Sequence, residues 1–167
     1  MICADILSER SRLSPDRTAL VEVATGRRFS YRELDHRASV CARAWLYGLG
    51  LKRGDRIGIL SANCVEFVES FFAAAKSGVI LVPLGTRLTA AELAVIVEDC
   101  SLSALIYGGE HAQTVTVMCA LVDPGRLVPV GEASKDGEIS WSDLMATVGA
   151  TDFLPGSCDP YDPLCLL

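Results

Sequence analysis

The sequence predicts an α/β protein whose mostly parallel sheet carries helices on its faces. Short apolar runs alternate with amphipathic helical patterns along the chain, and repeated strand–helix units of this kind place helical crossovers between parallel strands. The run Ile80–Pro83 is apolar throughout, as strands covered on both faces are. A length of 167 residues suits one domain, which can bury a sizeable core.

The first predicted unit is a β-hairpin that leads into a capped helix. Thr18–Val23 is expected to be a strand and Arg27–Phe29 its partner, because the turn signal Thr25–Gly26 lies between them. Ser30 and Glu33 have the spacing of a capping box, in which the hydroxyl and the carboxylate each accept a backbone N–H at the helix start. We therefore expect a helix to begin at Ser30.

This helix has one apolar face and a glycine-rich end. Gly48 and Gly50 are expected to end it, by supplying the positive φ that a helix C-terminus often needs. Apolar residues at helical spacing predict the face that packs on the sheet. They are Tyr31, Leu34, Ala38, Cys41, Trp45 and Leu49.

Strand and helix patterns then alternate. Arg56–Leu60 is predicted to be a strand, and the next helix is expected over about Cys64–Lys76, capped by Asn63 with Glu66. After the strand Ile80–Pro83, a second capping pair starts another helix. The elements that remain are a helix from Thr89 with Glu92 through Cys100, a strand Ala104–Tyr107, a helix Ala112–Leu121, a strand Arg126–Val130, a polar loop Gly131–Gly137 and a short helix near Trp141.

The end of the chain has a different composition. Residues 149–163 are rich in Gly, Pro, Ser and Asp, which predicts a surface loop. Leu164–Leu167 is apolar again, and we expect it to enter the sheet as a strand to hide its side chains. Because such a strand normally continues into a connection, we expect the sequence to be truncated.

Composition excludes several classes of function. The formal net charge is −6, with 15 Lys and Arg scattered among 21 acids, so a nucleic-acid partner is not expected. No stretch approaches the ~18 apolar residues of a transmembrane helix, and no secretory signal is recognisable. Seven cysteines show no C-x-x-C pair, which argues against a zinc site or a disulfide framework. We read them as reduced thiols in a cytoplasmic protein.

Several segments resemble the adenylate-forming superfamily, which contains the acyl-CoA ligases. Phe29–Leu34 is similar to its first core motif, which has an aromatic residue or Leu, then Ser or Thr, Tyr, any residue, Glu and Leu. Gly54–Ile57 followed by Ser61–Asn63 and Glu66 resembles the family's first βα unit, and Ala75–Leu93 its second core motif with the capped helix that follows. The segments occur in the family's order. Gly85 departs from it, since acyl-CoA ligases often carry Asn there.

The resemblance implies that residues 1–167 are a single partial domain, the N-terminal portion of an AMP-binding domain with an acyl-CoA-synthetase-like fold. The complete enzyme would join a carboxylate to AMP from ATP with Mg²⁺ and pass the acyl group to a thiol, usually coenzyme A. The resemblance places the phosphate loop just beyond Leu167, and the acyl pocket, the adenine-binding strand and the lid further on. It therefore assigns no catalytic, cofactor-binding or metal residue to this chain, and implies that no cofactor is bound by it.

The polar and aromatic residues that could suggest a functional site are instead expected to have structural roles. Lys76 reads as a solvated lysine at a helix C-terminus, favoured by the helix dipole, and Glu33 as part of its capping box. His36 and His111 lack a Cys or carboxylate arranged for nucleophilic catalysis. Gly108–Gly109 follows a strand, at a place where open α/β sheets bind ligands, but it lacks the G-x-G-x-x-G pattern of a nucleotide site. Trp45 and Tyr47 are expected to be core or partly buried aromatic residues.

We expect the chain to be the leading scaffold of an ATP-dependent carboxylate–CoA ligase, inactive by itself. Its partner would be the remainder of the ligase, in cis or as a complementary chain. Two alternatives stay open: part of an adenylation domain that loads a carrier protein, and a non-catalytic remnant or half-enzyme. An incomplete sheet with an open edge also predicts self-association.

Overall fold

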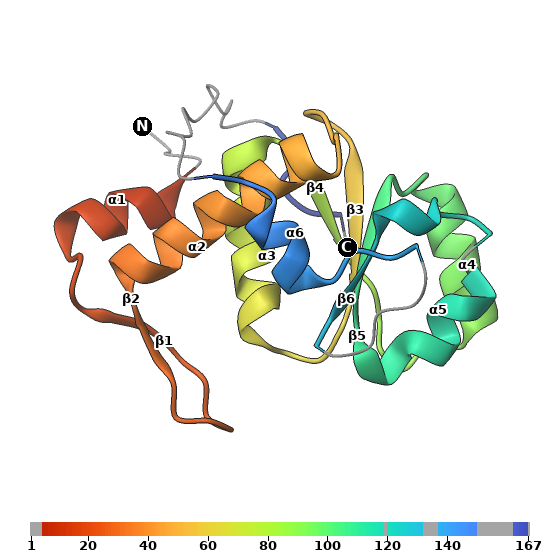
Figure 1. Cartoon of the computed structure of the whole chain (residues 1–167), viewed down its shortest axis with the longest axis horizontal. Helices are drawn as coiled ribbons and strands as arrows, with labels where there is room; N and C mark the ends of the chain where they lie inside the picture. Colours follow the sequence, from red (N-terminus) through yellow and green to blue (C-terminus); the bar gives the residue numbers. More distant parts are fainter. Residues whose placement is uncertain (1–4, 119, 132–136, 150–161, 167) are drawn as a thin grey trace.

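The computed structural model describes residues 5–118, 120–131, 137–149 and 162–166 and has three layers (Figure 1). A parallel sheet lies between two groups of helices, which confirms the predicted α/β fold. One face carries α2 (Tyr31–Arg43), α3 (Val65–Ser77) and α6 (Trp141–Ala146), and the other carries α4 (Ala90–Asp99) and α5 (Ala112–Met118).

The sheet has the strand order β4-β3-β5-β6, with every neighbouring pair parallel. In the central register, Ile57 pairs with Leu81 on one side and with Ala104 on the other. Because helices cover both faces, the strands are almost wholly buried and apolar. The strands are β3 (Arg56–Leu60), β4 (Ile80–Pro83), β5 (Ala104–Gly108) and β6 (Leu127–Val130).

Alternate residues of the strands build two separate cores. Ile57, Ile59 and Ile106 face α2, α3 and α6, where Trp45 and Trp141 join them. Leu60 and Tyr107 point to the opposite face, where helices α4 and α5 cover them. The two-residue alternation of strand side chains therefore assigns each apolar residue to one core or the other.

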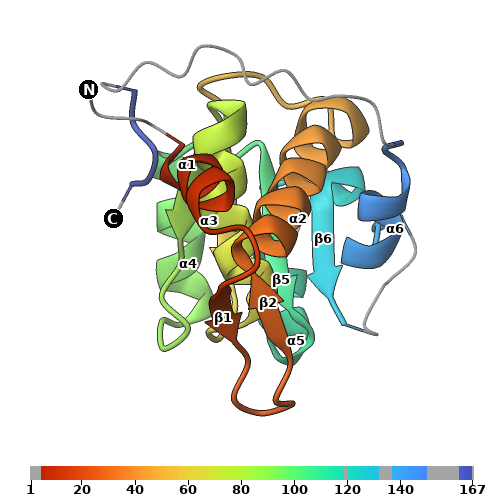
Figure 2. The same cartoon turned by 90° about the vertical axis from the view of Figure 1, so that its left-hand side faces the viewer.

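The hairpin and the capped helices agree with prediction. Strands β1 (Thr18–Val21) and β2 (Arg28–Ser30) are antiparallel, and the hairpin projects below the helices in Figure 2. The Ser30 backbone N–H donates to Glu33 Oε2 at 2.7 Å, and the Glu33 N–H donates to Ser30 Oγ at 3.2 Å. The same reciprocal pair forms at the start of α4 between Thr89 and Glu92.

One helix is absent from the predictions. Helix α1 (Ile6–Leu13) begins at Asp5, whose side chain accepts the Ser8 N–H at 3.1 Å. Only Leu7 is buried in it, while Ile6 and Leu13 are exposed. The helix therefore lacks the regular apolar stripe on which helix recognition depends.

One predicted helix start is wrong. Asn63 does not cap α3, because the N-cap is Cys64 and no side-chain cap hydrogen bond forms there. Helix α2 continues as a π-helix, η1 (Ala44–Gly48), which ends at Gly48 as predicted, but of the two glycines there only Gly50 has a positive φ, of +67°. Short 3₁₀ turns η2 (Gly109–His111) and η3 (Pro124–Arg126) precede α5 and β6.

The apolar C-terminal segment enters the sheet through a single bridge rather than a full strand. The Leu81 N–H donates to the Leu164 carbonyl and the Leu166 N–H donates to the Leu81 carbonyl, both at 3.0 Å. The next position of β4 that points to this side is Pro83, which has no N–H. The ladder therefore cannot continue. The predicted loop 149–163 lies outside the described residues except at its ends, as does Leu167.

Gly48 is required for close packing rather than for its backbone conformation. A Cβ there would lie 2.8 Å from Leu144 Cδ1 and 3.0 Å from Thr147 Oγ1. Both atoms belong to α6 or the residue that ends it, so α6 rests directly on the π-helix.

We expect Gly48→Ala to lower the free energy of unfolding by about 1–3 kcal/mol, because the methyl group overpacks this contact. Urea unfolding followed by circular dichroism measures the change. Gly149→Ala is the matched control, since nothing lies within 4 Å of a Cβ there and its φ is not positive. Equal free energies of unfolding for the two variants would show that α6 moves to accommodate the methyl group without a loss of stability.

Candidate functional site

The topology of the sheet singles out the carboxyl end of β3 as the place for a ligand. Helix α3, which follows β3, packs on one face, whereas α4 and α5, which follow its neighbours β4 and β5, pack on the other. Adjacent strands whose connections leave in opposite directions open a crevice between them, and open α/β sheets bind ligands there. Residues Ser61, Gly85 and Gly108–Gly109 lie at this edge.

The crevice offers little chemistry of its own. Ser61 Oγ donates to the neighbouring carbonyl of Ala62 at 3.0 Å. A Cβ on Gly108 would lie 2.5 Å from Glu110 Oε2, so the carboxylate of Glu110 covers this glycine and would repel a phosphate. His111 Nε2 lies 3.6 Å from Glu110 Oε1. In the described part of the chain, no group of three or more His, Cys, Asp or Glu could hold a metal ion.

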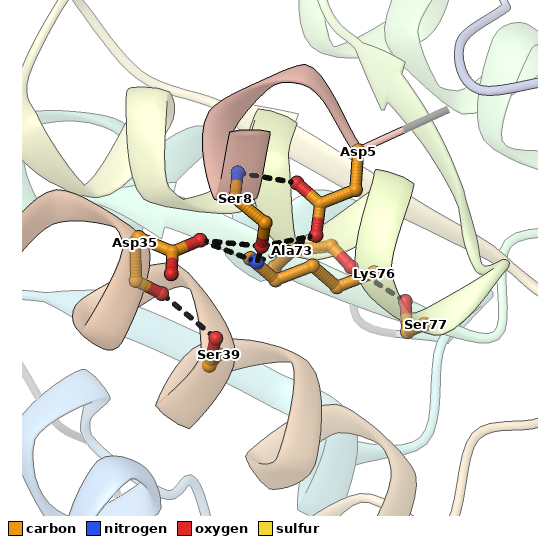
Figure 3. Close-up of polar contacts among 7 residues, drawn as sticks. All are labelled: Asp5, Ser8, Asp35, Ser39, Ala73, Lys76 and Ser77. Carbon is orange, nitrogen blue, oxygen red and sulfur yellow. Dashed lines mark hydrogen bonds and ion pairs between the residues drawn. The ribbon is translucent and has the colours of Figure 1, made fainter. Parts of the chain in front are cut away.

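The strongest polar cluster lies elsewhere, among α1, α2 and α3 (Figure 3). Lys76 Nζ donates to Asp5 Oδ2 at 2.7 Å, to Ser8 Oγ at 2.7 Å and to Asp35 Oδ1 at 2.6 Å. Its side chain is 3% exposed. The prediction of a solvated Lys76 is therefore wrong. Helix α1, absent from the predictions, covers it and supplies two of its partners.

The Lys76 cluster is saturated, which argues for a structural role. An ammonium group has three N–H donors, and each is engaged by a different side chain. Ser8 Oγ lies 2.7 Å from Asp5 Oδ2 and 2.9 Å from Asp35 Oδ1, so it links the two carboxylates. Moreover, α3 ends at Ser77 just before β4 begins, which places Lys76 at the amino end of the sheet, opposite the crevice.

The electrostatics of Asp5 reflect this pairing. Burial of Asp5 opposes ionisation, but hydrogen bonds from Lys76 and Ser8 outweigh it and hold the pKa of Asp5 below its ordinary value. The ionised form of Asp5 is thus the one that the fold favours. Since Asp5 also caps α1, its ion pair with Lys76 connects α1 to α3.

The other singled-out residues are not partners of Lys76. Glu33 is confined to its capping box, and His36 is exposed on α2. Trp45 is fully buried as predicted, whereas Tyr47 is 74% exposed and not a core residue. Cys41, Cys64, Cys100 and Cys165 are free thiols. Burial raises the pKa of Cys41 well above its ordinary value, which makes that thiol unreactive.

The fold and these motifs match one family of enzymes. The model of the AMP-binding enzyme family matches residues 7–166. The chain belongs to this family. The long-chain-fatty-acid–CoA ligase FadD13 of Mycobacterium tuberculosis is 38% identical over 119 residues, which cover 71% of this chain and 24% of that protein. Feruloyl-CoA synthase of Amycolatopsis is 38% identical over 125 residues, covering 74% of this chain and 24% of the synthase.

Solved structures agree. The N-terminal domain of FACL13 from Mycobacterium tuberculosis superposes with a TM-score of 0.80 at 31% identity, over 99% of this chain and 41% of that one. The anthranilate CoA ligase AuaEII, solved with anthranoyl-AMP, gives 0.79 at 28% identity, over 88% of this chain and 28% of that one. The chain thus spans about a quarter of the length of the ligases FadD13 and feruloyl-CoA synthase. In the described residues, no helix has the length and apolar character to cross a membrane.

We expect Lys76→Met to destabilise the protein by about 3 kcal/mol, because it leaves two carboxylates facing each other without a cation. Lys52→Met, which removes an exposed lysine, should change the free energy of unfolding by less than about 0.5 kcal/mol. Urea unfolding measures both. Amide exchange should also show α1 opening first in Lys76→Met, because α1 buries only Leu7 besides this cluster.

The contribution of Asp5 should depend on pH. A carboxyl group whose pKa is lowered by folding stabilises the protein above its unfolded pKa, and this contribution is lost as pH falls through the folded pKa. We expect Asp5→Asn to be less stable than the parent at pH 7 and nearly equal to it well below about pH 4. Thermal unfolding across pH 2.5–7 tests this, and a difference that persisted unchanged in acid would contradict the pairing.

Proposed function

We propose that this chain is the N-terminal scaffold of an ATP-dependent acyl-CoA ligase and that it supplies no catalytic group of its own. The observation that carries the proposal is the family match over residues 7–166, in a chain whose match to FadD13 covers 24% of that ligase. In the residues that the structure describes, the buried cation is saturated by Asp5, Ser8 and Asp35 at the opposite end of the sheet.

The cofactors of such a reaction would be ATP, Mg²⁺ and coenzyme A. The described residues do not by themselves fit these groups, because Glu110 covers Gly108 at the crevice and no cluster of metal ligands is found among them. The role of the scaffold is to hold the carboxyl edge of the sheet in place. The groups that bind phosphate and metal would come from the remainder of a ligase.

The partner of this chain is accordingly the rest of a ligase, in the same polypeptide or as a separate chain, in the cytoplasm. Relatives such as FadD13 have most of their length outside the matched region, and we expect the corresponding part of a ligase to pack against this domain. Without it, the outer edge of β6 has no strand partner among the described residues, and we expect copies of the chain to associate there.

The test has two parts. ATP–pyrophosphate exchange is measured for the isolated chain with hexadecanoate, ferulate and 2-succinylbenzoate, and we expect no rate above that without protein. The chain then replaces the matched region of FadD13, and the chimera is assayed with hexadecanoate. We expect acid-dependent exchange. Exchange by the isolated chain, or a folded chimera without activity, would contradict the proposal.

A further inference from the structure

A cavity of about 400 Å³ lies on the face that carries α2, α3 and α6. Figure 2 shows α2 between α3 and α6 on this face. All three helices contribute to the lining, and the crevice at the carboxyl end of β3 does not. The lining residues are His36, Arg37 and Val40 of α2, Glu69 of α3, and Trp141, Ser142 and Met145 of α6.

Glu69 is a buried carboxylate with few hydrogen bonds. Its side chain is 2% exposed, and among the described residues its hydrogen-bond partner is Arg37, whose Nε donates to Oε1. A carboxylate can accept about four hydrogen bonds. Burial raises the pKa of Glu69 even though Arg37 opposes this. Glu69 therefore has acceptor positions that the described residues leave unused.

Arg37 is held where it is by a second contact. Its guanidinium lies 5.4 Å from the centre of the Phe29 ring, and that of Arg27 lies 5.6 Å from the same ring. Cation–π attraction of this kind favours the observed position. Arg37 thus serves one oxygen of Glu69, and Glu69 itself lines the cavity, so a ligand there can supply a further donor.

The rest of the lining is mainly apolar, with His36 and Ser142 as its other polar residues. Val40, Trp141 and Met145 give the cavity an aliphatic side, an indole and a thioether, the mixture of apolar surface and a few polar groups that is typical of small-molecule sites. An indole also attracts cations. Arg37 already engages one oxygen of Glu69, so a ligand would be selected by the hydrogen bonds that it donates to the remaining acceptor positions and by the attraction of the indole for a cation.

We propose that this cavity binds an organic ammonium ion with an aryl or alkyl body. The ammonium group donates to Glu69, and the body packs on Val40, Trp141 and Met145. An anionic head group would meet the carboxylate unfavourably, and a purely apolar molecule would leave the acceptor positions of Glu69 unused. The proposal concerns a site apart from the crevice and does not depend on ligase activity.

The first test compares three ligands with one aryl body. The ¹⁵N-labelled chain is titrated with phenethylammonium, 2-phenylethanol and phenylacetate, and amide shifts are followed by NMR. We expect phenethylammonium to shift amides of α2, α3 and α6 around the cavity and to bind at least about fivefold more tightly than the other two. Equal binding of all three, or no binding of phenethylammonium at millimolar concentration, would overturn the proposal.

Variants then locate the site. We expect Glu69→Gln to weaken phenethylammonium binding by about tenfold, as loss of a hydrogen bond to a charged group does. Glu66→Gln, one turn earlier on α3 and outside the lining, should bind as the parent does. If Glu69→Gln fails to fold, Val40→Phe fills the cavity without touching the carboxylate and should also weaken binding. Unchanged binding in a folded Glu69→Gln or in Val40→Phe would place the ligand elsewhere.

Discussion

The need to cover a parallel sheet on both faces is the constraint on which the rest of this structure depends. A parallel strand exposes apolar side chains to both sides, and here Ile57 and Leu60 of one short strand belong to different cores. The helices must therefore divide between the faces, with α3 on one and α4 and α5 on the other. The crevice at the carboxyl end of β3 is a direct result of that division, before any side chain is considered.

Polar contacts have a different task in this molecule, because they supplement the small apolar cluster of Leu7, Leu34 and Ala38 that packs the peripheral elements. Helix α1 buries Leu7 and little else, and it is fixed by the hydrogen bonds that Lys76 makes to Asp5 and Ser8. At the other side of α2, Arg37 connects Phe29 of the hairpin to Glu69 of α3. Each of these two peripheral elements is thus joined to a buried charged side chain of α3 as well as packed on apolar residues.

The sequence predicted those elements whose signals are local. Continuous apolar runs identified the four parallel strands, and the pairs Ser30–Glu33 and Thr89–Glu92 located two helix starts correctly, because a capping box needs only neighbours in the chain. The environment of Lys76 could not be predicted, since Asp5 lies 71 positions away and α1 has no regular apolar stripe. One signal was available: Asp5 and Ser8 have the spacing of a helix cap. Glu69 also gave no signal, because its burial depends on how α2 packs over α3.

The absence of an N–H at Pro83 also bears on how this sheet meets other proteins. On the outer side of β4, Leu81 exchanges its hydrogen bonds with Leu164 and Leu166, and the position beyond it can accept but not donate. A strand from another protein that displaced the terminal segment could form both backbone hydrogen bonds with Leu81, but the next position, Pro83, would donate none. Edge prolines of this kind hinder the strand-by-strand growth of aggregates. Pro83, which limits the terminal segment to a single bridge, therefore also protects the outer edge of β4 against the addition of further strands, as in a fibril.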